Sequence, residues 1–343
     1  MAKFYSSNRQ RPFTKVVSLV AVVFVLSGCS DPAVSLMDDY ASRLGRTLEI
    51  ELQEPPPLDL LPLPSITTTR ADISESSITL VELVATRACG LDTLLGERNS
   101  SLGKVMTPSQ RLKYELTFLK QVQPCLTDSD IAPDLQQKLA AIASDKARQI
   151  DNHWQNFLLQ DETLRQQLHP YRNLSELNSV AGAADTIQAL HSLLALKKSI
   201  LEQNWQQASR INPEQALEAL YKANTLSQLQ QSLRFSQNWL RGLNQQLEQV
   251  DLNLICPVGK HSDKAEILNT ILLQYFIGKV QLYLAQVDGT YQQLYPLLQQ
   301  LYQGTALTQP IQQRFEVPET KLKAELKRHV FWWKKVQQQC PKL

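Results

Sequence analysis

The sequence is poor in glycine, aromatic residues and charge. It has 11 glycines in 343 residues, with 7% aromatic and 20% charged residues. Folds made of many short strands need frequent turn residues. The small number of glycines, beside abundant Gln, Leu and Ala, therefore favours helices. The hydrophobic content of 43% excludes a disordered chain. The length is enough for one large domain or two ordinary ones, with a genuine hydrophobic core.

Motifs that mark common enzymes are also missing. The chain contains no GxSxG, Walker, GxGxxG, HExxH or CxxC motif. Its five histidines are scattered over different segments: His153, His169, His191, His261 and His329. A catalytic site assembled from distant segments is still compatible with this pattern. We therefore expect no cofactor and no metal, and we assign no catalytic residue.

A run long enough to cross a membrane is lacking as well. The most apolar segment, residues 16–26, falls short of the roughly 20 apolar residues that span a bilayer. Four basic residues and no acidic residue precede it: Lys3, Arg9, Arg11 and Lys15. This order of a basic segment and a short apolar segment is typical of a secretory signal peptide, while a buried core helix is the alternative.

The signal segment ends in Leu26-Ser27-Gly28-Cys29, which resembles the bacterial lipoprotein signal motif. The resemblance implies removal of residues 1–28, attachment of a diacylglycerol to the Cys29 thiol and usually a further acyl chain, such as palmitate, on its amino group. Two or three chains together anchor a protein stably on a bilayer. Ser30, rather than Asp, follows Cys29, which by the enterobacterial sorting rule favours the periplasmic face of the outer membrane.

Loss of residues 1–28 reverses the sign of the net charge. The whole chain has 35 basic and 33 acidic residues, and the four basic residues before the apolar run would be removed, leaving 31 against 33. Binding to nucleic acid requires a concentrated basic face that displaces counterions. We therefore expect no nucleic-acid partner.

Four further cysteines would mature in an oxidising compartment: Cys89, Cys125, Cys256 and Cys340. Four cysteines allow three pairings. We favour Cys89 with Cys125 and Cys256 with Cys340, because each pair would join neighbouring helices. A zinc site is the alternative, but no two of these cysteines are close in sequence and no histidine lies at ligand spacing.

Apolar periodicity predicts an all-α fold, a multi-helix bundle with a long central helix and a lipidated, Pro-rich N-terminal arm. We divide the chain into a signal peptide (1–28), an anchored helix and arm (29–72) and a helical domain (73–343). Leu36, Tyr40, Leu44 and Leu48 recur every four residues and predict the first helix. The segment EPPPLDLLPLPS, residues 54–65, predicts an extended path. Its leucines indicate an arm packed on the domain, or else a segment that docks a partner.

Several later boundaries are predicted from capping residues. Thr107-Pro108 opens a helix, and Asn212-Pro213 opens an apolar pattern that would make one helix of about 40 residues, about 60 Å long. Residues 263–302 predict two segments joined near Asp288-Gly289. The last helix follows Val317-Pro318, and its aromatic residues near Trp332 belong either to the core or to a contact with anionic lipid.

The densest polar cluster in the chain comprises Glu97, Arg98, Asn99, Ser100, Ser101 and Lys104. In one interpretation Asn99 and the serines cap helix ends while Arg98 pairs with Glu97. In the other, Arg98 and Lys104 bind an anionic group. A nucleophile formed by Ser100 or Ser101 with Lys104 is a third interpretation, for which the spacing fixes no geometry.

The segments RACGLDTLLGERNSSLGKVM (87–106) and LGERNSSLGKVMTPSQRLKYELTFL (95–119) resemble a signature of an uncharacterised family of proteobacterial lipoproteins, classified only as a domain of unknown function. The resemblance implies a lipidation motif and a mostly helical body. It implies no activity, substrate or cofactor.

We therefore hypothesise a lipid-anchored envelope protein that faces the periplasm and binds or scaffolds another envelope component, either a protein or a glycan. The alternatives are an envelope enzyme, or a carrier of a hydrophobic ligand, with a site built between helices. An enzyme should have a pocket of convergent polar groups, a binding module should expose an apolar surface, and a carrier needs an apolar cavity.

Overall fold

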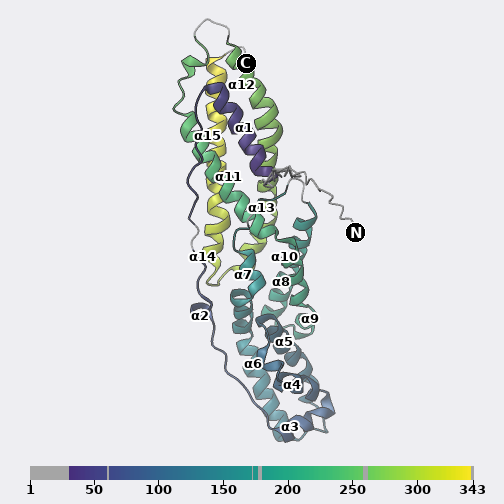
Figure 1. Ribbon diagram of the computed structural model, residues 1–343. Helices are drawn as coiled ribbons and strands as arrows, with labels where there is room; N and C mark the ends of the chain where they lie inside the picture. The colour runs from purple at the N-terminus through teal and green to yellow at the C-terminus, as the bar shows by residue number, and fades with distance from the viewer. Residues whose placement is uncertain (1–30, 60–61, 172, 177–179, 258–261, 341–343) are drawn as a thin grey trace, which may run out of the picture. The chain divides into compact units, whose positions relative to one another are not determined.

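The computed structural model describes residues 31–59, 62–171, 173–176, 180–257 and 262–340 (Figure 1). All regular secondary structure in these residues is helical, so the expected all-α class is confirmed. No helix in these ranges is long and apolar enough to cross a membrane. The signal segment and Cys29 lie outside the described residues.

The first helix, α1 (Pro32–Leu48), forms as its spacing predicts. The side chain of Asp31 caps it by accepting the Ala33 N–H at 2.9 Å, and Met37, Tyr40 and Leu44 are buried. Residues 31–343 form one compact unit. Helix α1 therefore belongs to the same body as the helices at the end of the chain.

The later helices follow in chain order. They are α2 (Ile66–Thr69), α3 (Leu80–Ala85), η1 (Thr86–Cys89), α4 (Asp92–Asn99), η2 (Gly103–Val105), α5 (Pro108–Cys125), α6 (Pro133–Gln160), α7 (Glu162–Gln167), α8 (Val180–Leu201), α9 (Trp205–Ala208), α10 (Pro213–Ala223), α11 (Thr225–Leu247), η3 (Leu252–Leu254), α12 (Asp263–Thr270), η4 (Ile271–Val280), α13 (Gln281–Tyr302), α14 (Thr308–Ile311), η5 (Gln312–Glu316) and α15 (Val317–Gln339).

The expected helix of about 40 residues from Pro213 to Leu254 is wrong, because the chain breaks at Asn224. Asn212 caps α10 as predicted. Asn224 then adopts a left-handed conformation with φ 50°, and its N–H still reaches the Leu220 carbonyl. Asn tolerates this conformation better than most residues. The apolar period continues through the break because both helices bury leucines, and α11 ends at Leu247.

The joint expected near Asp288-Gly289 is also absent, since both residues lie inside α13. The helical run from α12 to α13 is continuous, and its winding changes earlier, in the π-helical segment η4. Glycine in a helix interior costs only about 1 kcal/mol. Burial of Val287 and Tyr291 on either side offsets this penalty.

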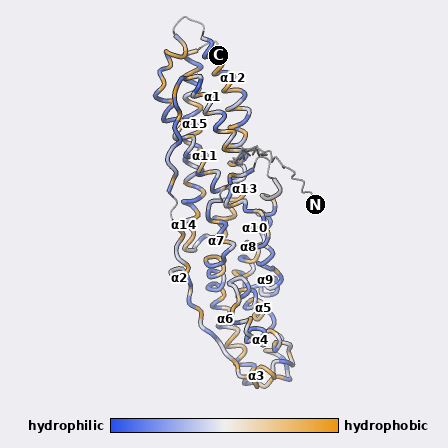
Figure 2. Tube along the Cα trace, viewed as in Figure 1, coloured by the Kyte–Doolittle hydropathy of each residue, from blue (hydrophilic) through white to orange (hydrophobic). Residues whose placement is uncertain are grey.

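Two hydrophobic cores organise the helices. The larger core takes side chains from most helices of the chain. The smaller core lies between η1, α4, α5 and α6 and consists of Leu91, Leu95, Phe118, Val122, Cys125, Ile131, Leu135, Leu139, Ile142 and Ala143. Helices α5 and α6 contribute to both cores. Figure 2 shows hydrophobic and hydrophilic residues interspersed along the helices.

One disulfide bond lies at each of the two cores. Cys89 at the end of η1 is bonded to Cys125 at the end of α5, with Cα atoms 5.2 Å apart, and Cys256 is bonded to Cys340 after α15, at 5.7 Å. These are the two pairs favoured from the sequence. Both separations are ordinary for disulfides.

The Pro-rich segment belongs to a longer connection, residues 49–59 and 62–79, which is extended apart from the single turn of α2 and which we call the strap. Side chains of α11 hold its first part: Gln246 bonds both the N–H and the carbonyl of Gln53, at 2.7 and 2.9 Å, and Asn238 donates to the Pro56 carbonyl at 2.8 Å. A Cβ at Gly242 would lie 2.8 Å from the Pro55 side chain, so glycine permits this close approach. The described part of the arm is therefore packed on the domain, and Figure 1 shows the strap continuing toward α3.

A buried polar network connects α1 to α11 and α15. The Tyr40 hydroxyl lies 2.6 Å from His329 Nε2, and the Asn244 side-chain oxygen lies 2.8 Å from His329 Nδ1. The Trp333 indole N–H donates to the Tyr40 oxygen at 3.0 Å. All of these contacts are buried, so Trp333 and its neighbour Trp332 belong to the core, whereas Phe331 is exposed.

The hydrogen bonds fix the form of the His329 ring. The Asn244 amide nitrogen donates to the Glu325 carbonyl, so its oxygen must accept from His329 Nδ1–H. His329 Nε2 is then an acceptor for the Tyr40 hydroxyl. A second ring proton, on Nε2, would face the donating hydroxyl of Tyr40. Burial lowers the pKa of His329 to about 3.

We expect this network to make the fold sensitive to acid. Because the folded chain holds His329 neutral while the unfolded chain protonates it near pH 6.5, the free energy of unfolding should fall by about 3 kcal/mol from this residue between pH 6.5 and 4. Denaturant unfolding over that range should show a weaker pH dependence in His329→Gln than in the natural chain. His191→Gln, at an exposed position of α8, is the matched control. Equal pH dependence in His329→Gln and the natural chain would contradict this account.

Candidate functional site

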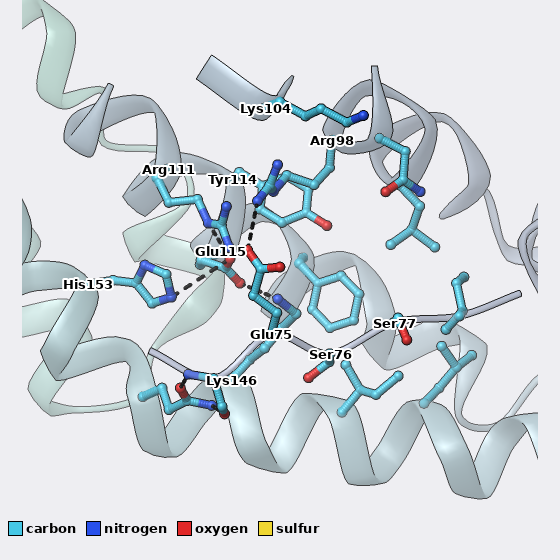
Figure 3. Close-up of a pocket in the computed structure, with 18 residues that line it drawn as sticks. Glu75, Ser76, Ser77, Arg98, Lys104, Arg111, Tyr114, Glu115, Lys146 and His153 are labelled. Carbon is cyan, nitrogen blue, oxygen red and sulfur yellow. Dashed lines mark hydrogen bonds and ion pairs between the residues drawn. The ribbon is translucent and has the colours of Figure 1, made fainter. Parts of the chain in front are cut away.

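A pocket of about 460 Å³ lies between the strap, α4, α5 and α6. We call it the strap pocket. Its cationic side chains are Arg98, Lys104, Arg111 and Lys146, and its apolar side chains include Leu95, Phe118, Leu139 and Ile142. Figure 3 shows charged groups gathered around Glu75 and Glu115, with Ser76 and Ser77 of the strap farther along.

Glu115 is the buried centre of the charged cluster. Lys146 Nζ lies 2.6 Å from one carboxylate oxygen, and Arg111 Nε lies 3.1 Å from the other. Arg111 and Glu115 are one turn apart on α5, whereas Lys146 comes from α6. Lys146 also lies over the Phe118 ring, 5.1 Å from its centroid. Two cations therefore compensate a carboxylate that water does not reach.

His153 of α6 faces the same carboxylate, with Nε2 3.8 Å from Glu115. Burial lowers its pKa to about 4, although the charge of Glu115 acts in the opposite direction. His153 is therefore neutral at pH 7. The positive charge around Glu115 comes from Arg111 and Lys146.

Arg98 and Arg111 converge on a second carboxylate, that of Glu75 in the strap. Arg98 Nη2 lies 3.5 Å and Arg111 Nη2 3.8 Å from the same oxygen of Glu75. The Glu75 side chain is 77% exposed, whereas the two arginines are 19% and 24% exposed. Arg98 is positioned by a bond of 2.7 Å from Nη1 to the Gly103 carbonyl. Two well-oriented guanidinium groups thus share one loosely held, exposed carboxylate.

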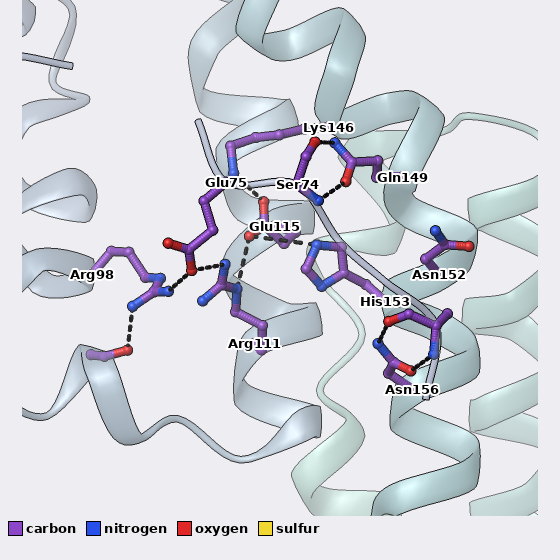
Figure 4. Close-up of polar contacts among 12 residues, drawn as sticks. Ser74, Glu75, Arg98, Arg111, Glu115, Lys146, Gln149, Asn152, His153 and Asn156 are labelled. Carbon is purple, nitrogen blue, oxygen red and sulfur yellow. Dashed lines mark hydrogen bonds and ion pairs between the residues drawn. The ribbon is translucent and has the colours of Figure 1, made fainter. Parts of the chain in front are cut away.

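The strap beside the pocket is held by amide side chains of α6. Asn156 bonds both the N–H and the carbonyl of Ala71, at 2.8 and 2.9 Å, and Asn152 donates to the Asp72 carbonyl at 2.9 Å. Gln149 accepts the Ser74 N–H at 2.6 Å. We call Gln149, Asn152 and Asn156 the amide ladder. Figure 4 shows it leading along α6 to the cluster around Glu75 and Glu115.

The structure divides the polar cluster singled out in the sequence. Arg98, Asn99 and Lys104 line the strap pocket. Ser100 instead stabilises the turn after α4: its hydroxyl donates to the Glu97 carbonyl at 2.7 Å and accepts the Gly103 N–H at 3.1 Å.

Glu97 and Ser101 are exposed. The ion pair of Arg98 reaches Glu75 in the strap, where the sequence interpretation placed Glu97.

Sequence reasoning missed Glu75, Arg111, Glu115, Lys146 and His153, although these residues make up most of the charged cluster. The spacing of Arg111 and Glu115 by four was a usable signal for a helical ion pair. The other contacts join α5, α6 and the strap, and no local pattern indicates which helices pair.

Within the described ranges, no group of three or more His, Cys, Asp or Glu side chains is arranged to hold a metal ion. The lining of the strap pocket instead carries four cationic side chains and two carboxylates. This charge balance suits an anionic group better than a cation.

The family described as "Protein of unknown function (DUF3080)" matches residues 37–342, so the chain belongs to that family. No curated protein and no solved structure matches the chain. The match covers the strap, the pocket, the smaller core and nearly all of the larger core, and the family description gives no activity.

Glu115→Gln should destabilise the fold by about 3 kcal/mol, because Lys146 and Arg111 would then be left around a neutral side chain in a buried site. Glu97→Gln, at an exposed position, should change the free energy of unfolding by less than about 0.5 kcal/mol. Chemical denaturation measures both.

Glu115→Gln combined with Lys146→Met removes one charge of each sign and should recover part of the loss. A double variant less stable than Glu115→Gln by the full cost of Lys146→Met alone would show that the two residues are not coupled.

Proposed function

We propose that the chain is a lipid-anchored protein of the bacterial cell envelope, on the periplasmic face of the outer membrane, and that it binds another envelope component. The two disulfides suggest an extracytoplasmic protein, since such bonds persist in oxidising compartments. The Leu26-Ser27-Gly28-Cys29 motif supports the anchor. Acyl chains on Cys29 would attach the protein to the membrane through its N-terminus.

The observation that carries the proposed binding role is the arginine pair of the strap pocket. Arg98 and Arg111 are mostly buried and aimed at one point, yet their shared partner there is an exposed carboxylate. Buried guanidinium groups bind carboxylate or phosphate strongly, and exposed carboxylates exchange readily with solvent or a ligand. The ligand group that fits this position is therefore an anion.

Exposed apolar side chains beside the pocket favour a macromolecular partner. Leu80, Val81 and Val84 of α3 are 76%, 80% and 55% exposed, and they follow directly after the strap residues that line the pocket. Grouped exposed apolar residues are typical of interaction surfaces. The combination of an anion site with an apolar rim supports a binding module.

The convergent polar groups of the pocket keep an envelope enzyme as the second candidate function. Glu115 and His153 are the buried carboxylate and imidazole in the lining of the pocket. Glu115, however, is engaged by two cations, and His153 is held neutral by burial. A carrier of a hydrophobic ligand is less favoured, because this pocket has charged walls.

Photocrosslinking in cells tests the binding role. A photoreactive residue at Asn99, which is exposed and lines the pocket, should capture an envelope component, and Arg111→Gln should reduce that capture several-fold by removing one guanidinium. The same probe at His191, on the exposed surface of α8, is the control position. Capture at Asn99 that is unchanged in Arg111→Gln would contradict the role of the arginine pair.

A separate experiment tests the anchor. Cells fed a clickable palmitate analogue should label the natural chain, and Cys29→Ser should lose the label and leave the membrane fraction. The paired replacement Cys89→Ser with Cys125→Ser removes two cysteines elsewhere and should keep the label. Label retained in Cys29→Ser would contradict lipidation at this residue.

A further inference from the structure

The strap beside α6 is bound as an extended peptide is bound by a receptor. The amide ladder contacts its main chain: Asn156 at Ala71, Asn152 at Asp72 and Gln149 at Ser74. Contacts to main-chain groups hold an extended segment in register with little regard for its side chains. The carboxylate of Glu75 then contacts both Arg98 and Arg111.

The geometry of the ladder matches an extended chain. Gln149 and Asn156 are seven residues apart in α6, which corresponds to about 10 Å of helix rise. Their strap partners, Ser74 and Ala71, are three residues apart, which corresponds to about 10 Å of extended chain. The two segments run antiparallel and stay in register over this distance.

The strap is held differently here than on α11. From Ser74 to Ser77 every residue is exposed, whereas Ile78 after them packs on the smaller core. On α11, Pro55 is half-buried against Gly242, and Leu52 packs on the larger core. Segments held by exposed hydrogen bonds open at a lower free energy than segments that bury apolar area. Residues 74–77, which bury no apolar side chain, are therefore a part of the strap that can open and exchange with a ligand.

We propose that the amide ladder of α6 and the arginine pair Arg98 and Arg111 form a binding site for an extended acidic peptide segment of a partner protein, and that strap residues 71–77 are its built-in occupant. This proposal rests on the proposed binding role and names the chemistry of the partner. The partner segment supplies main-chain groups to the ladder and a carboxylate in place of that of Glu75. The exposed apolar residues of α3 follow the strap in the chain.

Competition between the strap and a peptide tests this inference. The probe is a fluorescent peptide with the sequence of residues 70–79, RADISESSIT, and its binding to the full chain in detergent is followed by fluorescence anisotropy. Glu75→Gln should strengthen probe binding about fivefold, because the internal competitor loses its charge-assisted contact. Asp72→Asn makes the same charge change three residues earlier in the strap, and it should leave the affinity within about twofold of the natural chain.

A second comparison asks whether the probe uses the arginine pair. On the Glu75→Gln chain, a probe with Gln in place of its glutamate should bind about fivefold more weakly than the acidic probe. Adding Arg111→Gln to that chain should remove the difference between the two probes. Thermal unfolding should be nearly unchanged by Glu75→Gln, since this side chain is mostly exposed.

Equal binding of the acidic and neutral probes, or no gain in Glu75→Gln over Asp72→Asn, would overturn the proposal. Capture of only a lipid or a glycan at Asn99 would also overturn it. In both cases, loss of Asn99 capture in Arg111→Gln would still support the broader binding role. Failure of this proposal is thus distinguishable from failure of the proposed function.

Discussion

The position of α1 depends on the buried contact of Tyr40 with His329, and the strap depends on the position of α1. Tyr40 comes from the first helix and His329 from the last, while Asn244 of α11 completes the network. The Tyr40 oxygen contacts both His329 Nε2 and the Trp333 N–H, and an unpaired polar group in this core would be penalised. The network therefore specifies how α1 sits against α11 and α15. Since the strap begins where α1 ends, the same contact fixes where the strap meets α11.

A second constraint lies where the two cores meet on α5 and α6. Leu112, Leu116 and Leu119 of α5 face the larger core, while Phe118 and Val122 face the smaller one. Glu115 lies between these sets and cannot be left alone in an apolar site. Lys146 and Arg111 neutralise it and extend positive charge toward the strap. The boundary between the two cores on α5 and α6 is thus also the place where an anion can bind.

Local signals in the sequence identify much of the helical framework. Thr107-Pro108 and Asn212-Pro213 cap helices because a side-chain acceptor and a proline act within one turn. The break at Asn224 has only one weak local signal, because the leucine period runs through it. The charged cluster is harder still to predict: Glu75, Glu115 and Lys146 are 31 or more residues apart and meet through helix pairing. Arg98 and Lys104 stand out only because polar residues are locally dense.

The chemistry of the strap links this architecture to binding. An extended segment fixed by buried leucines would close the groove permanently, whereas amide side chains from α6 hold the main chain here and leave Ser74 to Ser77 exposed. Its ends are secured elsewhere, by packing on α11 and by the capping box that starts α3 at Thr79. Release of the middle therefore does not require the cores to open. Because the released segment stays tethered, it competes at a high local concentration. The affinity for any external ligand is then set by the difference between its contacts and those of Glu75, rather than by the full strength of the arginine pair.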